Sequence, residues 1–279
     1  MGYYKNSLKN RIKLLRKRPA HRLKIFFDYL FKRREIEPVF VIATRRSGSN
    51  LLLGYLNSIP DASFASEILN ASMFYGIRNR LISKSAVLRH IVYSLNHCES
   101  KICGAKLLNV QLDTHRLSPE DLKKHFPCAR FIILHRKTLL RQFVSLKIAE
   151  TTGVWQWTDG DYPPPPAVRI SIPEFQHYQR NINSFYKGLS GKKWLKDCSI
   201  KVSYEDLADD AQKVFDELIF PFLRLPQSKV SSPARKQSPD ELRKIVENYR
   251  EIEPFLFDGQ EGHTSGVIHS PVFEVRKAS

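Results

Sequence analysis

The chain has 279 residues, of which 42% are hydrophobic and 26% are charged, as in ordinary folded domains. This length suits one large α/β domain with an appendage, which can bury a full core without metals or disulfides. No apolar stretch approaches the roughly 18 residues that a membrane-spanning helix needs. The cysteines form no CxxC pair and have no metal-ligand spacing, so we expect reduced thiols and a cytoplasmic protein; the four are Cys98, Cys103, Cys128 and Cys198.

Positive charge is concentrated at the start of the chain. The formal net charge is +17, and residues 1–34 contain twelve Lys and Arg against one acid, Asp28. Apolar residues recur there at helical spacing, so the segment is basic and amphipathic. It could dock on the rest of the protein, lie on the inner face of an anionic membrane as a peripheral contact, or bind nucleic acid. We divide the chain into a helical arm (1–37), a main domain (38–260) and a C-terminal tail (261–279).

After the arm, apolar strands alternate with helical patterns, which indicates an α/β fold with a central parallel sheet flanked by helices. Ser followed by Pro and acids predicts helix starts at Ser118, Ser171 and Ser238. Residues 158–167, with four consecutive prolines, are predicted to form a stiff loop. The predicted strands are Val39–Ala43, Lys101–Leu107, Arg130–Leu134 and Ser199–Ser203, and further predicted helices are Asn50–Asn57, Lys137–Glu150 and Tyr204–Leu223.

A polar turn containing a glycine, Thr44–Ser49, follows the first predicted strand. Turns between a buried strand and a helix bind phosphate, because backbone N–H groups and the positive end of the helix dipole face the ligand. Arg46 adds a cation, and Gly48 lets the backbone approach closely. The hydroxyls of Ser47 and Ser49 add hydrogen-bond donors. The GxxxxGK[ST] pattern is absent, which disfavours ATP hydrolysis of the P-loop type.

A second cationic turn, at Arg136, follows the predicted strand Arg130–Leu134, and Ser145 lies about two helical turns beyond it. Cations at this end of a parallel strand are well placed to meet a ligand. Taken alone, the segment is equally typical of a solvated, basic helix start.

Together, these segments resemble the sulfotransferases that use 3′-phosphoadenosine-5′-phosphosulfate (PAPS). Thr44–Leu52 resembles the loop that cradles the 5′-phosphosulfate, and Arg136 with Ser145 resembles the pair that holds the 3′-phosphate. Val202–Leu207 is similar to the family's YEDL signature. Arg136–Trp155 is nearer to the bacterial trehalose and glycolipid branch. The resemblance spans roughly residues 38–256 and implies a P-loop-like sulfotransferase fold.

The resemblance implies transfer of a sulfuryl group from PAPS to a hydroxyl of a carbohydrate, glycolipid or other small molecule, with PAP as product and no metal. The acceptor is then the main partner, with an anionic membrane a further partner through residues 1–34. A homo-oligomer stays open, and nucleic acid is not expected. The residues implied to hold the nucleotide are Arg46, Ser47, Gly48, Ser49, Asn50, Arg136, Ser145 and Tyr204.

The resemblance also suggests Glu67 as the general base. Cytosolic relatives place a His just after the strand equivalent to Ile102–Lys106, and this chain has none there. The bacterial carbohydrate branch instead uses a Glu after the phosphosulfate loop. A carboxylate can serve if a partly apolar setting raises its pKa. Glu67 could equally be a solvated loop acid or a helix cap, with Asp61 and His135 as fallback bases; Lys106 is implied to stabilise the transferring group.

Two alternatives stay open. Trp155 and Trp157 either form a platform for the acceptor or anchor the proline-containing loop. The chain as a whole could instead be a non-enzymatic basic module that binds an anionic membrane or nucleic acid. Such a module needs no glycine turn between strand and helix, and the sequence lacks base-stacking aromatic motifs. These observations favour the enzyme.

Overall fold

The computed structural model describes residues 37–70, 83–96, 98, 100–155, 164–233 and 242–256. The basic arm, the tail 261–279, Trp157 and the helix start at Ser238 lie outside the described residues. The proposed division into arm, domain and tail therefore stays a prediction.

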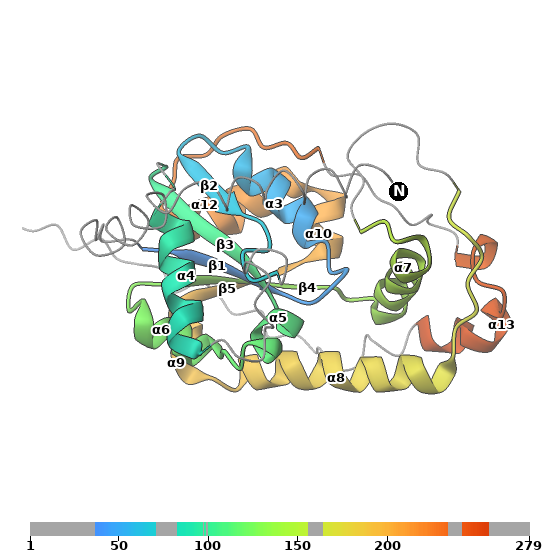
Figure 1. Cartoon of the computed structure of the whole chain (residues 1–279). Helices are drawn as coiled ribbons and strands as arrows, with labels where there is room; N and C mark the ends of the chain where they lie inside the picture. Colours follow the sequence, from blue (N-terminus) through green and yellow to red (C-terminus); the bar gives the residue numbers. More distant parts are fainter. Residues whose placement is uncertain are drawn as a thin grey trace, which may run out of the picture.

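A five-stranded, all-parallel sheet forms the centre of the molecule (Figure 1), in the order β2-β3-β1-β4-β5. β1 is central and is buried along its whole length. From β1 the chain passes to β2 and β3 on one side, and β4 and β5 lie on the other, so the carboxyl end of β1 is a topological switch point where open sheets bind ligands. The strands are β1 (Val39–Ala43), β2 (Ala62–Ala65), β3 (Ile102–Leu108), β4 (Arg130–His135) and β5 (Ser199–Ser203).

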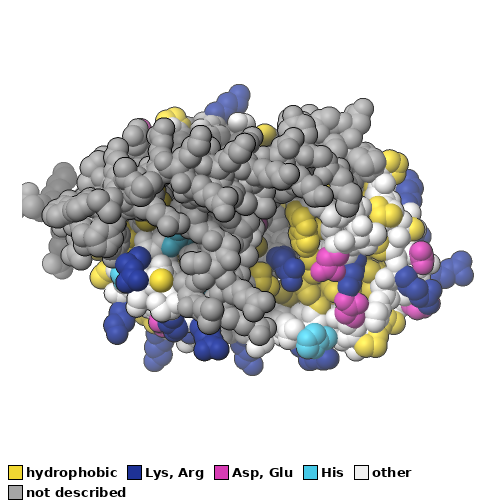
Figure 2. All heavy atoms as spheres, in the orientation of Figure 1, with side chains coloured by type: hydrophobic (Ala, Val, Ile, Leu, Met, Phe, Trp, Pro, Cys, Tyr) yellow, Lys and Arg dark blue, Asp and Glu magenta, His cyan; other side chains and the backbone are white. Residues whose placement is uncertain are grey.

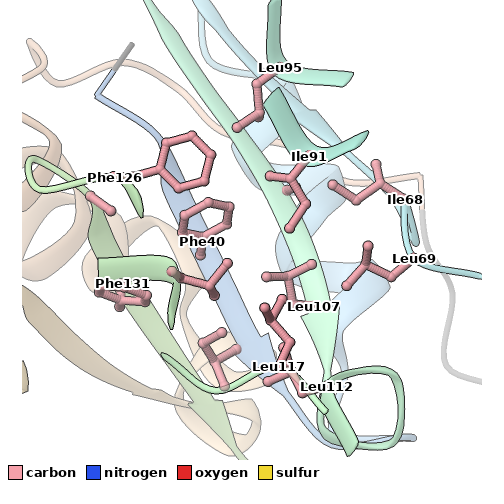
Figure 3. Close-up of a cluster of buried hydrophobic side chains, with 14 of the residues drawn as sticks. Phe40, Ile68, Leu69, Ile91, Leu95, Leu107, Leu112, Leu117, Phe126 and Phe131 are labelled. Atoms are coloured by element: carbon pink, nitrogen blue, oxygen red, sulfur yellow. The ribbon is translucent and has the colours of Figure 1, made fainter. Parts of the chain in front are cut away.

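Helices cover both faces of the sheet, because successive side chains of a strand point to opposite faces. On one face, Phe40 packs with Leu107 and with Ile91 of α4 (Figure 3). On the other face, Val41 packs with Leu52 of α3. The helices are α3 (Ser49–Asn57), α4 (Lys84–Asn96), α5 (Asn109–Thr114), α6 (Pro119–His125), α7 (Leu139–Thr152), α8 (Ile172–Ser190), α9 (Lys193–Lys196), α10 (Tyr204–Asp209), α11 (Ala211–Val214), the π-helix η3 (Phe215–Ile219), α12 (Phe220–Leu223), η4 (Leu242–Lys244), α13 (Tyr249–Ile252) and η5 (Glu253–Leu256).

A separate apolar cluster fixes α7 beside the sheet. Phe143 of α7 packs on Phe175 of α8, with ring centroids 5.6 Å apart. Val168 and Val246 extend this cluster through a single parallel bridge. The packing determines which α7 side chains face the end of β1.

The predicted fold class, an α/β fold with a central parallel sheet flanked by helices, is confirmed. Each of the four predicted strands is present within one residue of its predicted bounds. The Ser118 hydroxyl accepts from the Asp121 N–H at 3.2 Å, and the Ser171 hydroxyl accepts from the Glu174 N–H at 3.4 Å, so both N-caps are also confirmed.

The predicted helix Tyr204–Leu223 is interrupted. Asp210 has φ −146° and ψ 87°, outside the helical region, and its carboxylate accepts from the Lys213 N–H at 3.0 Å. Asp favours this behaviour because its short side chain competes for local backbone N–H groups. The segment therefore divides into α10, α11, η3 and α12.

The prediction of reduced thiols is wrong for two of the four cysteines. A disulfide joins Cys98, just after α4, to Cys103 near the start of β3. The thiols of Cys128 and Cys198 are free. Within the part of the chain that the structure describes, no helix combines the length and apolar character needed to cross a bilayer.

Candidate active site

The turn between β1 and α3 has the local structure of an anion-binding loop. Gly48 precedes α3 with φ 86°, the left-handed region that glycine adopts most readily. A Cβ at Gly48 would lie 2.3 Å from Cδ2 of Tyr204, so that ring packs directly on the turn. Gly48 stands at the N-cap position and so offers no side chain to cap α3. The backbone N–H groups and the positive dipole at a helix start of this kind suit an anionic ligand.

Helix α7 holds this turn from the other side. The buried Gln142 donates from Nε2 to Thr44 Oγ1 at 2.8 Å and to the Arg45 carbonyl at 2.6 Å. The turn is held at a conformational cost, since Arg46 also has a positive φ, 62°. Non-glycine residues in this region persist where surrounding contacts fix them, often at functional sites.

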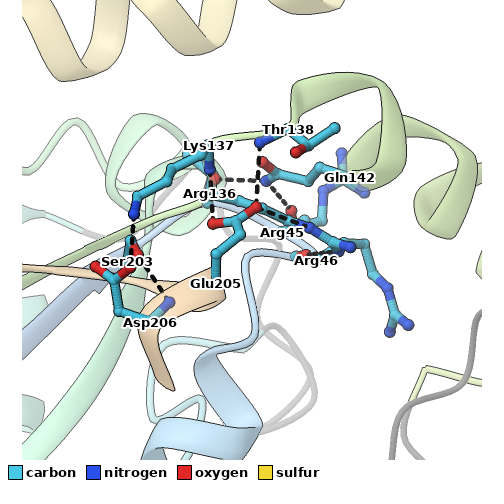
Figure 4. A network of polar contacts seen from close by, with 10 residues as sticks. Arg45, Arg46, Arg136, Lys137, Thr138, Gln142, Ser203, Glu205 and Asp206 are labelled. Atoms are coloured by element: carbon cyan, nitrogen blue, oxygen red, sulfur yellow. Dashed lines mark hydrogen bonds and ion pairs between the residues drawn. The ribbon is translucent and has the colours of Figure 1, made fainter. Parts of the chain in front are cut away.

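Three of the residues predicted to hold the nucleotide form one network. Arg46 donates from Nε to the Ser145 hydroxyl at 3.0 Å. Arg136 donates from Nη1 to the Arg46 carbonyl at 3.3 Å, as Figure 4 shows. Arg46 also donates from Nη1 to the Trp155 carbonyl at 2.6 Å. The structure thus places two guanidinium groups and a hydroxyl beside the uncapped end of α3.

Arg136 is a buried cation with donor capacity to spare. The residue is 9% exposed, and its guanidinium carbon lies 4.4 Å from the centre of the Tyr204 ring. Nε is buried and makes no hydrogen bond. Burial lowers the pKa of Arg136, while Tyr204 and Glu205 act in the opposite direction. An arginine keeps its charge in proteins, so the group is a permanent cation at the end of β4.

A second cationic group lies on the β3 side of the turn. Lys106 is 1% exposed, and its Nζ donates to Asn50 Oδ1 at 2.6 Å and to Glu67 Oε1 at 3.1 Å. Burial lowers the pKa of Lys106, and the charge of Glu67 opposes that shift. The ammonium group is therefore aimed at the first turn of α3 by two fixed acceptors.

The surroundings of Glu67 are polar rather than apolar. Its side chain is 34% exposed and also accepts from Asn70 at 3.3 Å and from Gln111 at 3.4 Å. One carboxylate oxygen is held by Lys106, and the other is shared between the two amides. Glu67 is thus oriented beside the site by three polar partners among the described residues.

The remaining candidates lie apart from this network or at its edge. Asp61 precedes β2, at the amino end of the sheet, with its carbonyl accepting from Ile102 N. His135 ends β4 and packs edge-on against Tyr186, with ring centroids 6.2 Å apart. Trp155 follows α7 and is 45% exposed.

Sequence reasoning assigned no role to several residues that shape the site. Gln142 and Tyr186 hold Thr44, and Glu205 binds the start of α7. Glu205 and Gln142 carried a signal, because they belong to the YEDL segment and to the Arg136–Trp155 run, whereas Tyr186 carried none. Within the described residues, no three His, Cys, Asp or Glu side chains gather in a way that could hold a metal ion.

No protein-family model matches the chain, and no curated protein sequence matches it either. Among solved structures, a sulfotransferase from Alicyclobacillus acidocaldarius is 14% identical with a TM-score of 0.48, over 82% of this chain and 93% of that one. The mouse sulfotransferase SULT7A1 complexed with PAP is 14% identical with a TM-score of 0.41, over 86% and 72%. A sulfotransferase domain from the curacin biosynthetic pathway is 13% identical with a TM-score of 0.42, over 70% and 76%.

Proposed function

We propose that the protein is a PAPS-dependent sulfotransferase. In this proposal it transfers a sulfuryl group from PAPS to a hydroxyl of a carbohydrate, glycolipid or other small molecule. The observation that carries the proposal is the convergence of Arg46, Arg136 and Ser145 beside the uncapped start of α3. Such a site suits a nucleotide with two separate anionic groups.

The donor set fits PAPS better than ATP. PAPS carries a 3′-phosphate and a 5′-phosphosulfate on one ribose, and the site offers cations on both sides of the turn. Arg136 and Ser145 lie on the β4 side, and Lys106 with Asn50 lies on the β3 side. The guanidinium group of Arg136 is buried at the end of β4, with Nη1 on the Arg46 carbonyl, and it brings a positive charge to the β4 side of the turn. The packing of Tyr204 on Gly48 supports the assignment of Gly48, Ser49 and Tyr204 to the same nucleotide. The predicted role of the Ser47 hydroxyl is not supported, because this hydroxyl is buried and donates to the Thr44 carbonyl at 2.8 Å.

When bound, PAPS would supply an activated sulfuryl group and a phosphate leaving group. Arg46 and the N–H groups at the start of α3 would stabilise negative charge that develops during transfer. Lys106 would add a third positive charge, in a buried setting where charges are poorly screened. Glu67 would accept the proton of the acceptor hydroxyl, with its carboxylate oriented by Lys106.

The alternative function is that of a non-enzymatic basic module. Figure 2 shows Lys and Arg side chains along the edge of the molecule where α8 and α9 lie, and Lys124, Lys187, Lys193 and Lys196 are exposed. α6 leads into β4 and α9 leads into β5, so Lys124, Lys193 and Lys196 lie near the amino ends of the strands. Lys187 follows Tyr186, which contacts Leu134 toward the carboxyl end of β4. A module that used these exposed cations would not need the buried cations Arg136 and Lys106 at the candidate site.

The arm and the acceptor extend the proposal. The excess of cations over residues 1–34 could hold the enzyme at an anionic membrane that carries a lipid-linked acceptor. Removal of residues 1–34 should then abolish binding to anionic liposomes while nucleotide affinity stays unchanged. Liposome binding that survives the deletion would contradict a membrane role for the arm.

The proposed function is tested by isothermal titration of the full chain with PAP, AMP and ATP at moderate salt, without added metal. We expect saturable binding of PAP at least about tenfold tighter than that of AMP or ATP, because only PAP has a 3′-phosphate for Arg136. Weak binding of all three that fades equally with salt would overturn the proposal and favour the basic module.

A further inference from the structure

Helices α3 and α7 both begin beside this site, and in neither does the N-cap residue, Gly48 or Thr138, provide a side-chain cap. The two starts differ in the acidic group that lies at α7. At the start of α7, Glu205 Oε2 accepts from the Lys137 N–H at 2.9 Å and Oε1 accepts from the Thr138 N–H at 3.1 Å (Figure 4). A carboxylate of the protein thus binds the two backbone N–H groups just before α7, close to the positive end of that helix, where a ligand phosphate could otherwise bind.

The same carboxylate contacts the cation of the site. Glu205 Oε1 lies 4.0 Å from Nε of Arg136, and the ring of the preceding residue, Tyr204, lies against the Arg136 guanidinium. Arg136 is therefore held between Glu205 and Tyr204, two adjacent residues at the start of α10. With Nε toward Glu205, Arg136 Nη1 reaches the Arg46 carbonyl.

We infer that Glu205 is a positioning residue that makes the site selective for a nucleotide with a 3′-phosphate. Its negative charge disfavours a phosphate at the N–H groups of Lys137 and Thr138, just before α7, so an anion is better placed at the turn before α3. Its ion pair fixes Arg136 in the orientation in which Nη1 reaches the carbonyl of Arg46, whose own side chain contacts Ser145. This inference rests on the proposed function, since it assumes that Arg136 and Ser145 receive the 3′-phosphate.

The test compares Glu205→Gln with a neighbouring control, Asp206→Asn. Asp206 also lies in the first turn of α10, but its partner is the exposed ammonium group of Lys137, with Oδ1 and Nζ 2.6 Å apart. Titration with PAP and with AMP gives a selectivity ratio for each protein. A purely structural role would lower both affinities together, whereas a positioning role changes the ratio.

We expect Glu205→Gln to lower the PAP-to-AMP selectivity about tenfold, because the orienting charge is lost while the side-chain volume is kept. Asp206→Asn should retain the wild-type ratio. If Glu205→Gln does not fold, Glu205→Asp is judged by the same criterion, because a shorter side chain withdraws the carboxylate from Arg136.

The outcomes separate the proposed function from the inferred role of Glu205. A wild-type protein without preference for PAP overturns the proposed function and this inference with it. A wild-type preference that persists in a folded Glu205 variant overturns the inference alone. Equal losses of selectivity in the Glu205 and Asp206 variants also overturn it, since any acid at the start of α10 would then suffice.

Discussion

The Nε of Arg46 lies 3.0 Å from the hydroxyl oxygen of Ser145, although the two residues are 99 positions apart in the sequence. Arg46 belongs to the turn after β1, and Ser145 lies in the middle of α7. The contact joins the residue expected at the 5′-phosphosulfate to one expected at the 3′-phosphate. The two ends of the proposed nucleotide site are therefore coupled through side chains.

This coupling predicts that Arg46→Ala and Ser145→Ala are not additive. Arg46→Ala should weaken PAP by about 10- to 100-fold, as expected for lost charge-assisted hydrogen bonds, and Ser145→Ala by about tenfold. The double variant should lose less than the sum, because each residue orients the other. Titration with PAP measures the affinity of the two single variants and of the double variant. Arg45→Ala, which removes an exposed cation from the same turn, should change little; strict additivity would contradict the coupling.

Glu67→Gln separates catalysis from binding. The amide oxygen of Gln can still accept from Lys106, so the fold and the PAP affinity should be kept within about threefold. Turnover of an accepted substrate should fall by about 10²–10⁴, the usual contribution of a general base. Glu150→Gln, a change to a surface acid on α7, is the control for loss of one charge. Full turnover in Glu67→Gln would place the base elsewhere.

Gly48→Ala should damage both stability and nucleotide binding. The left-handed backbone costs an Ala about 1–2 kcal/mol, and the new Cβ would displace the Tyr204 ring from the turn. Since that ring also packs on Arg136, PAP affinity should fall in the fraction that folds. Thermal unfolding and titration report the two effects.

The matched control is Gly188→Ala in α8. Among the described residues, and apart from its own helix backbone and chain neighbours, no atom lies within 4 Å of a Cβ placed at Gly188, and its backbone is helical. This change should stabilise the protein by about 0.5–1 kcal/mol, because Ala is a better helix former than Gly. A Gly48→Ala protein as stable as Gly188→Ala would show that the turn tolerates a side chain.

The sequence was informative about the strands of the sheet centre and the turn after β1, because buried runs such as Val39–Ala43 are continuous and apolar. It did not predict β2, a strand of four residues in which buried positions alternate with more exposed ones. That strand depends on a tertiary contact, since the Asn57 side chain bonds both the N–H of Phe64, at 2.6 Å, and its carbonyl, at 3.0 Å. No local sequence pattern predicts such a contact.

The sequence predicted which residues form the candidate site, but it did not predict how they contact one another. Motif resemblance selected Arg46, Arg136 and Ser145, but their network depends on how α7 packs on α8. Composition favoured free thiols, whereas the Cys98–Cys103 disulfide depends on the approach of two segments around a short loop. Glu205 lies within the YEDL segment, yet its proposed role depends on the position of the start of α7.

Tyr186 should make the stability of the protein depend on alkaline pH. Its hydroxyl donates to the Leu134 carbonyl at 2.6 Å, and burial raises the pKa of Tyr186 to about 12. An unfolded Tyr loses its proton near pH 10, whereas native Tyr186 keeps its proton up to about pH 12. The contribution of Tyr186 to stability is therefore complete below pH 10 and is lost as the pH rises toward 12.

Tyr186→Phe should lower the free energy of unfolding by about 1–2 kcal/mol near neutral pH. Urea unfolding at several pH values should show this difference shrinking above about pH 10. Burial raises the pKa of Tyr178 as well, and the charge of Tyr186 adds to that shift, so the comparison is made in a Tyr178→Phe background. A difference that stays constant up to the alkaline limit of folding would mean that the Tyr186 hydroxyl does not hold its proton in the native state.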